Sequence, residues 1–400
     1  MTGKDKTMKT TKHKTLVKTT CILLITLTSA SLVEAYPPDN AAVLYYKAFL
    51  ILKEPSQEVK EMMADMRHGK IKANDQVRQC LEENRYALEF VETAADVREC
   101  DWGHDISRGL GVLMPELSKV RSTAFMLTAN AQILAEEGDY RAALARCLTI
   151  HKMARHVSDS LLISYLVSTA LNSLANERIK DFLSSMPQET ETLTWLKSRV
   201  VAVSANAPSI KGAMVREKEI IIQEIRREKI DGLLEALDDD FLKDTGNAET
   251  VEKVRKGDLK FFKDSREYYA NFMDETIVAL DLPYGESHRK LAELSARLEK
   301  DAKDNPVAIM AAMLVPATGR VRTLGTKSGT LFNAIRAAIE IYIVKAKTGR
   351  LPEKLPADLP KDLFSGKDFE YERTKNGFTL RCRAKDLDKD EIYQYEFKTR

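Results

Sequence analysis

The sequence is poor in glycine, proline and cysteine, with 17 Gly, 12 Pro and 5 Cys among 400 residues. So few turn-forming residues favour helices over an all-β architecture. The chain also lacks the sequence patterns of a nucleophile elbow, a phosphate-binding glycine loop and an HExxH zinc site. Its hydrophobic fraction of 44% and charged fraction of 30% are those of a globular protein. We therefore expect a folded, mainly helical protein in which no reaction is evident from motifs.

Residues 1–35 have the pattern of an export signal. Six lysines precede the short apolar run Ile22–Leu32, and Ala35 provides a small residue at a cleavage point. The run is too short to span ~30 Å of hydrocarbon. Because the segment carries six Lys against Asp5 and Glu34, its removal changes the net charge to +2 − 4 = −2. The sequence predicts an exported protein, periplasmic or extracellular, with no transmembrane span after cleavage and no nucleic-acid partner.

Four cysteines remain after cleavage: Cys80, Cys100, Cys147 and Cys382. An even number permits disulfides in an oxidising compartment, but the spacing shows no disulfide framework. Buried free thiols are the preferred alternative, because free cysteine is among the most buried residue types. The sequence does not choose between three possible full pairings.

Apolar residues at helical spacing predict a series of helices. These are expected over 39–67 with an interruption at Pro55, and over 74–99, 117–136, 140–156, 160–183, 191–206, 209–237, 251–280, 288–303, 307–315 and 331–347. Short connections between long helices imply antiparallel neighbours. We expect a helical-hairpin or bundle domain over residues 36–325.

One helical hairpin is specified by its turn. Gly138 suits a left-handed helix C-cap, and Asp139 suits the N-cap of the next helix. With these two, the positions Ala131, Leu134, Tyr140, Ala143 and Leu144 resemble the turn-centred half of a tetratricopeptide repeat. No second copy follows at a 34-residue period, so the resemblance implies one repeat-like hairpin and no solenoid.

The C-terminal residues 326–400 predict a small α+β module. After the helix at 331–347, alternating residues over 369–373, a turn at Asn376-Gly377 and alternation over 378–384 and 393–397 predict a three-stranded antiparallel sheet. The passages Thr348–Pro352 and Pro360–Lys367 resemble the globular head of type II secretion pseudopilins. Residues 86–185 together with this tail also resemble a group of uncharacterised exported bacterial helical proteins.

Asp386, Asp388, Asp390 and Glu391 form an acidic run between two expected strands. Calcium takes oxygen ligands from acidic loops, and the pseudopilin resemblance implies calcium in a comparable loop. The run is therefore a candidate Ca²⁺ site, with a solvated acidic turn as the alternative.

Asp101, His104 and Asp105 beside Trp102 form the most polar cluster between helices. Two carboxylates and an imidazole are groups that perform general acid–base catalysis, so these three are candidate catalytic residues. The alternative is a loop anchored by Trp102, with aspartates that cap helices.

Two Cys/His pairs at four-residue spacing, Cys100 with His104 and Cys147 with His151, are candidate zinc ligands. The alternative is a thiol packed beside a partly buried histidine. Nothing in the sequence brings the two pairs together.

Three functions follow from these observations. The first is an exported, non-enzymatic scaffold that binds a protein partner in the cell envelope. The second, implied by the pseudopilin resemblance, is an accessory component of a type II secretion-like or pilus-like system. The third is an envelope enzyme that uses the loop at 100–105.

Overall fold

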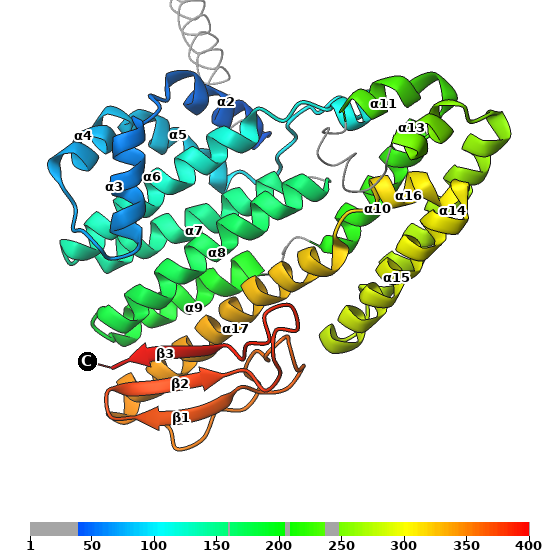
Figure 1. Cartoon of the computed structure of the whole chain (residues 1–400). Coiled ribbons are helices and arrows are strands. Elements are labelled where there is room, and N and C mark those ends of the chain that lie inside the picture. Colours follow the sequence, from blue (N-terminus) through cyan, green and yellow to red (C-terminus); the bar gives the residue numbers. More distant parts are fainter. Residues whose placement is uncertain (1–38, 159–160, 205–208, 237–247, 400) are drawn as a thin grey trace, which may run out of the picture.

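The computed structural model describes residues 39–158, 161–204, 209–236 and 248–399. They form a mainly helical protein that ends in a small three-stranded sheet, as the sequence predicts (Figure 1). The expected export signal at 1–35 lies outside the described residues.

The first helical unit consists of the helices α2 to α9, drawn from blue to green in Figure 1. They are α2 (Ala41–Ile51), α3 (Gln57–Arg67), α4 (Asp75–Glu83), α5 (Arg85–Asp96), α6 (Glu116–Glu136), α7 (Tyr140–Val157), α8 (Leu162–Ser185) and α9 (Thr190–Ser204), with a 3₁₀ helix at Ile106–Gly111.

The second helical unit consists of the helices α10 to α16. They are α10 (Ile210–Glu224), α11 (Ile230–Ala236), α13 (Ala248–Arg255), α14 (Leu259–Ala279), α15 (Tyr284–Asp304) and α16 (Ile309–Leu314), with 3₁₀ turns at Arg227–Lys229 and Pro306–Ala308. The last residue of the helix expected over 209–237 lies outside the described residues.

The chain closes with α17 (Thr318–Thr348), followed by β1 (Glu370–Thr374), β2 (Gly377–Arg381) and β3 (Gln394–Lys398). The sheet is antiparallel in the order β1-β2-β3. The β1–β2 turn lies one residue earlier than predicted, because Thr374 pairs with Gly377 and leaves Lys375 and Asn376 as the loop.

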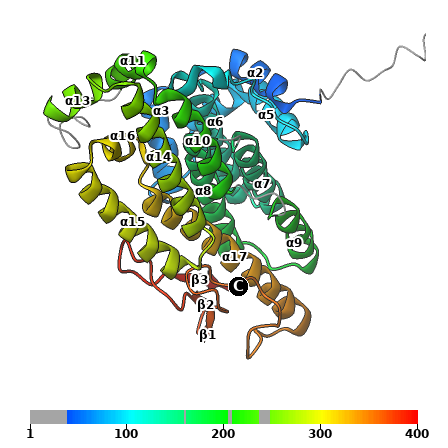
Figure 2. The same ribbon diagram turned by 90° about the vertical axis from the view of Figure 1, so that its right-hand side faces the viewer.

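Two apolar cores divide the molecule. One joins the first helical unit to the second half of α17 and the sheet, and the other joins the second helical unit to the starts of α8 and α17. Figures 1 and 2 show α14 and α15 on one side and α7 and α9 on the other, with α8 and α17 between them. The helices α8 and α17 therefore contribute to both cores.

The hairpin of α6 and α7 forms as its turn residues predict. Gly138 has a φ of 91°, which a residue with a side chain rarely adopts. The Asp139 carboxylate accepts a hydrogen bond of 3.0 Å from the Ala142 N–H and so caps α7.

Three predicted long helices are each broken into two. The helix expected over 209–237 breaks at Ile225 and Arg226, whose backbones are not helical. The helix expected over 74–99 breaks at Asn84, because the Asn84 amide bonds both backbone groups of Lys53, at 2.8 and 3.0 Å. The helix expected over 251–280 breaks before Asp258, whose carboxylate caps α14 at the Phe261 N–H at 2.7 Å. At Asn84 and Asp258, hydrogen bonds from the side chain to the backbone compete with continuation of the helix.

The helix expected over 331–347 begins 13 residues earlier than predicted, at Thr318. The domain boundary expected at 325 therefore falls inside α17. Because this helix is continuous and contributes residues to both cores, it does not mark a domain boundary.

By length and composition, the helical run Pro306–Thr348 is the one in the described residues that could cross a membrane. The core helix of a soluble protein meets the same criteria. In the run Pro306–Thr348, 44% of the most apolar stretch is buried inside the protein. Ala334, Ile335 and Tyr342 of this run have no exposed surface. We therefore describe α17 as a core helix.

Candidate functional site

The loop around Trp102 is held by packing and by local hydrogen bonds. The Trp102 ring is 4% exposed, stacks on Tyr45 with centroids 5.2 Å apart, and donates from Nε1 to the His156 carbonyl at 2.8 Å. Asp101 accepts from the Gly103 N–H at 2.8 Å, and Asp105 caps the following 3₁₀ helix. Asp105 thus has the helix-capping role of the structural alternative, whereas Asp101 bonds within the loop.

His104 is paired with a carboxylate that sequence reasoning did not identify. Its Nε2 lies 3.0 Å from Oε1 of Glu116, and the two side chains are only 10% and 1% exposed. Glu116 lies in the first turn of α6, where an acidic residue is expected merely for its favourable interaction with the helix dipole. A histidine–glutamate pair thus joins this loop to α6, a contact that the predicted group of Asp101, His104 and Asp105 did not include.

The acidic run of the C-terminal module is divided among separate partners. Asp386 is 1% exposed and accepts from the Asp388 N–H at 2.9 Å and the Tyr393 hydroxyl at 2.8 Å. Asp390 pairs with Lys385.

Asp388 bonds His288 of α15 at 2.9 Å. Burial raises the pKa of Asp388, but hydrogen bonds from Thr323 and His288 outweigh burial and hold that pKa below its ordinary value. Asp386 thus makes hydrogen bonds within the C-terminal module, and Asp388 connects the module to the second helical unit.

Glu391 is exposed, and its backbone pairs with that of Asp386. The described part of the chain contains no group of three or more His, Cys, Asp or Glu side chains arranged to hold a metal ion. Calcium binding by the residues at 386–391 therefore stays a prediction without support from the geometry.

None of the four cysteines of the described residues forms a disulfide. Cys147 and Cys382 are buried thiols, as the preferred alternative predicts, whereas Cys80 and Cys100 are half-buried. Cys147 is fully buried, and burial raises the pKa of its thiol to about 12. His151, its expected zinc co-ligand, bonds Asn172 instead. Burial also raises the pKa values of the Cys80 and Cys382 thiols.

A cavity between the two helical units, here called the inter-unit cavity, has a volume of about 520 Å³. Its walls come from α7, α8 and the first half of α17, together with the end of α9, the start of α10 and the turn between α14 and α15. Ligand-binding cavities in proteins commonly have volumes of ~300–1,000 Å³. The cavity brings together residues that are far apart in the sequence.

Three polar atoms of the cavity walls have no hydrogen-bond partner in the described part of the protein. They are His151 Nε2 of α7, Asn176 Oδ1 of α8 and Arg322 Nε of α17, all three buried. The His151 side chain is 6% exposed and the Asn176 side chain 1%. Leaving a buried polar group unpaired costs roughly 1–3 kcal/mol. The Asn176 amide also lies close enough to His151 to raise the pKa of that imidazole, so a ligand would complete the hydrogen bonds of a His151–Asn176 pair and of Arg322.

The hydrogen bonds of the two orphaned side chains define what they offer. His151 Nδ1 lies 2.8 Å from Asn172 Oδ1, which only accepts, so Nδ1 carries the proton and Nε2 has a free lone pair. Asn176 donates from its Nδ2 to the Ser328 carbonyl at 3.1 Å, which leaves Oδ1 as an acceptor. The walls formed by α7 and α8 therefore contain two acceptors, and both lie beneath the surface of the cavity.

His151 is neutral at pH 7. Burial lowers its pKa to about 4, although the amides of Asn172 and Asn176 oppose that shift. A neutral imidazole is uncharged and keeps its acceptor lone pair.

Arg322 supplies the unbalanced charge of the cavity. No carboxylate among the described residues lies within ion-pair distance of it, whereas the nearby Lys211 is paired with Asp281. The Arg155 guanidinium is directed to the carbonyls of Val97 and Arg98, outside the cavity. Of the three cations in the lining, Arg322 is thus the one that bonds no carboxylate and only the Leu282 carbonyl, at 3.5 Å.

The inter-unit cavity was not identified from the sequence. In the sequence, His151 is only a candidate zinc ligand, and Asn176 and Arg322 are separated by 146 residues (322 − 176). Comparison with protein-family models, with curated proteins and with solved structures finds no match for this chain. Any functional argument therefore depends on the site itself.

Proposed function

We propose that the protein binds a small molecule that carries a carboxylate next to a hydrogen-bond donor, such as a hydroxy acid or an amino acid, in the inter-unit cavity. The observation that carries the proposal is the set of orphaned polar atoms around one cavity. A ligand carboxylate would accept from Arg322, and a hydroxyl or ammonium group would donate to His151 Nε2 and Asn176 Oδ1.

Binding without catalysis fits the walls of this cavity better than a reaction does. The imidazole of His151 is neutral, and Asp281, the one carboxylate of the lining, is engaged with Lys211. Among the described lining residues, no nucleophile is paired with a general base, as acyl or phosphoryl transfer would require. Export to the cell envelope, which the N-terminal segment predicts, remains part of the proposal.

The test is a thermal-unfolding screen of the exported chain with L-lactate, L-malate, glycine and L-glutamate, and with uncharged glycerol and cationic choline as controls. A ligand at 100 times its Kd stabilises the folded state by roughly 2.7 kcal/mol. We expect at least one carboxylate to raise the unfolding midpoint and neither control to do so. Absence of a response to every carboxylate would contradict the proposal.

Arg322→Met separates binding from folding. Its free energy of unfolding should stay the same or rise by up to ~1 kcal/mol without ligand, because an unpaired buried donor is removed. The response to the carboxylate should disappear. Arg320→Met, on the same helix but exposed and outside the cavity lining, is the matched control and should retain the response. A response that survives Arg322→Met would show that the carboxylate binds elsewhere.

A further inference from the structure

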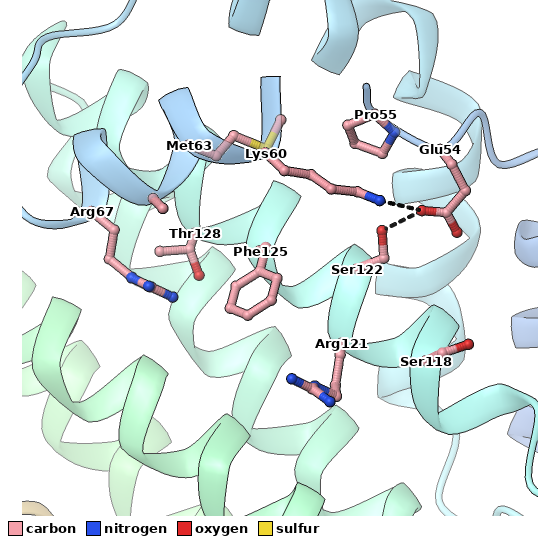
Figure 3. A pocket seen from close by; sticks show the side chains of 11 residues that line it. Glu54, Pro55, Lys60, Met63, Arg67, Ser118, Arg121, Ser122, Phe125 and Thr128 are labelled. Atoms are coloured by element: carbon pink, nitrogen blue, oxygen red, sulfur yellow. Dashed lines mark hydrogen bonds and ion pairs between the residues drawn. The ribbon is translucent and has the colours of Figure 1, made fainter. Parts of the chain in front are cut away.

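A groove between α3 and α6, here called the α3–α6 groove, is separate from the inter-unit cavity and shares no lining residue with it. Its volume is about 420 Å³ (Figure 3). Met63 of α3 and Phe125 of α6 provide its apolar surface, and the Phe125 side chain is 40% exposed. The chain thus presents an accessible aromatic ring inside a concave site.

Cations dominate the charge of this groove. Its lining contains Lys60, Arg67 and Arg121 against the single carboxylate of Glu54, a balance of 3 − 1 = +2. Figure 3 shows Lys60 extending across the groove to Glu54. This local excess contrasts with a whole chain whose net charge is only +2 over 400 residues.

The one carboxylate is already shared. Glu54 accepts from the Lys119 ammonium at 2.7 Å and from the Ser122 hydroxyl at 2.8 Å, and it lies 4.0 Å from Lys60. Burial raises the pKa of Glu54, but the bonds from Lys119 and Ser122 outweigh burial and lower it below its ordinary value. Glu54 therefore remains ionised and is bonded to Lys119 and Ser122, not to the arginines.

The two arginines are not matched by carboxylates of the protein. In the described ranges, no Asp or Glu lies within ion-pair distance of Arg67 or Arg121, and the Arg67 guanidinium instead lies over the Phe125 ring at 5.3 Å. That cation–π contact holds a charge directly beside the apolar surface. Arginine and aromatic side chains together in a concave patch are typical of the strongest contacts in protein interfaces.

We infer that the α3–α6 groove docks an acidic segment of a partner protein, with a large apolar side chain against Phe125 and Met63 and flanking carboxylates on Arg67 and Arg121. Charge complementarity selects an acidic partner, because the groove has two guanidinium groups without carboxylates. The exposed apolar surface selects a side chain rather than a free carboxylate, since a small ion would leave Phe125 uncovered.

The experiment pans a random 12-residue peptide display library on the exported chain and measures an enriched peptide by fluorescence anisotropy. We expect enrichment of sequences in which Asp or Glu flank Phe, Leu or Trp. The double variant Arg67→Glu, Arg121→Glu should weaken the enriched peptide more than tenfold, and Phe125→Ala should weaken it several-fold. Arg289→Glu with Lys300→Glu, two exposed cations on α15, is the charge-matched control and should change the affinity less than twofold.

Thermal unfolding of each variant shows whether it is folded. Enrichment of peptides without acidic residues would overturn the inference, as would equal binding to wild type and the double variant. A (dT)20 oligonucleotide is measured beside the peptide. If it bound more tightly than the peptide and lost binding in the same variants, the groove would be a nucleic-acid site and the inference would be wrong.

Discussion

The two halves of α17 have the same secondary structure and opposite roles. The half Thr318–Thr330 contains three glycines and several buried hydroxyl groups, and it forms a wall of the inter-unit cavity. The half Leu331–Thr348 places Ile335, Ile339 and Tyr342 in the core shared by the first helical unit and the sheet. One continuous helix is thus a cavity wall at one end and a core element at the other.

The difference shows how a helix can be buried without being apolar. Thr323, Thr326 and Thr330 each donate their hydroxyl to a carbonyl one turn earlier in the same helix, at 3.2, 2.9 and 2.7 Å. Those hydroxyl groups need no outside partner. Arg322 Nε has none inside the described protein, and it is one of the atoms that the proposed ligand would pair.

The largest effect is expected from the core half, at Tyr342. This side chain is fully buried, packs on Phe378 with centroids 5.3 Å apart, and donates to the Lys398 carbonyl at 2.6 Å. Tyr342→Ala should lower the free energy of unfolding by about 3–5 kcal/mol, measured by urea unfolding, because it leaves a cavity between helix and sheet. Tyr342→Phe, which keeps the ring, should cost only about 1 kcal/mol. Equal losses for both would mean that packing on the sheet contributes nothing.

A smaller effect is expected from His151, whose ring lies 5.2 Å from that of Phe332 where the two halves of α17 meet. Because burial lowers its folded pKa to about 4, the unfolded chain binds a proton at His151 at a higher pH than the folded protein does. Between pH 6.5 and 4 protons therefore favour unfolding. The stability is present above pH 6.5 and is lost as the pH falls, by about 1.4 kcal/mol for each unit of pKa difference.

Urea unfolding at pH 7.0 and pH 4.5 measures this effect. The acid-induced loss should be smaller by about 2–3 kcal/mol in His151→Gln than in wild type, since the variant has no imidazole to protonate at this position. His68→Gln, at an exposed histidine, is the control and should follow wild type. If His151→Gln also followed wild type, His151 would not be held neutral by burial.

The sequence predicts the two halves of α17 with different success. Ile335, Ile339 and Ile343 recur at four-residue spacing, so the second half is evident as a helix with one apolar face. The first half contains Gly319, Gly325 and Gly329 among Ser and Thr, which are weak helix formers, and it was missed. Packing against the neighbouring helices α8 and α15 overrides that weak preference.

The same reasoning explains what was missed at the candidate sites. A single histidine, asparagine or arginine in a helix resembles any other surface residue, and only the tertiary fold places His151, Asn176 and Arg322 around one cavity. Glu116 was missed as the partner of His104 for the same reason, although the two are only 12 residues apart (116 − 104). The sequence does predict the turn at Gly138 and the cap at Asp139, because these features depend on neighbouring residues alone.

The smallest effect on stability, and the sharpest contrast between the halves, is expected at Gly325. Here α17 approaches α8 so closely that an added Cβ would lie 2.2 Å from the Tyr165 hydroxyl oxygen. Tyr165 lines the cavity, so its ring can yield by turning into that space. Gly325→Ala should therefore change the free energy of unfolding by no more than ~1 kcal/mol, because better helix propensity offsets the displacement.

The binding response should nevertheless fall in Gly325→Ala, because the displaced Tyr165 ring would occupy part of the volume that the carboxylate needs. The double variant Gly325→Ala, Tyr165→Leu removes the obstruction and should recover the rise in unfolding midpoint. Gly319→Ala, whose Cβ would meet no atom within 4 Å, is the matched control and should bind as wild type does. If Gly325→Ala left the response intact, the ligand would not bind against this half of α17, and the contrast between the two halves would be one of packing alone.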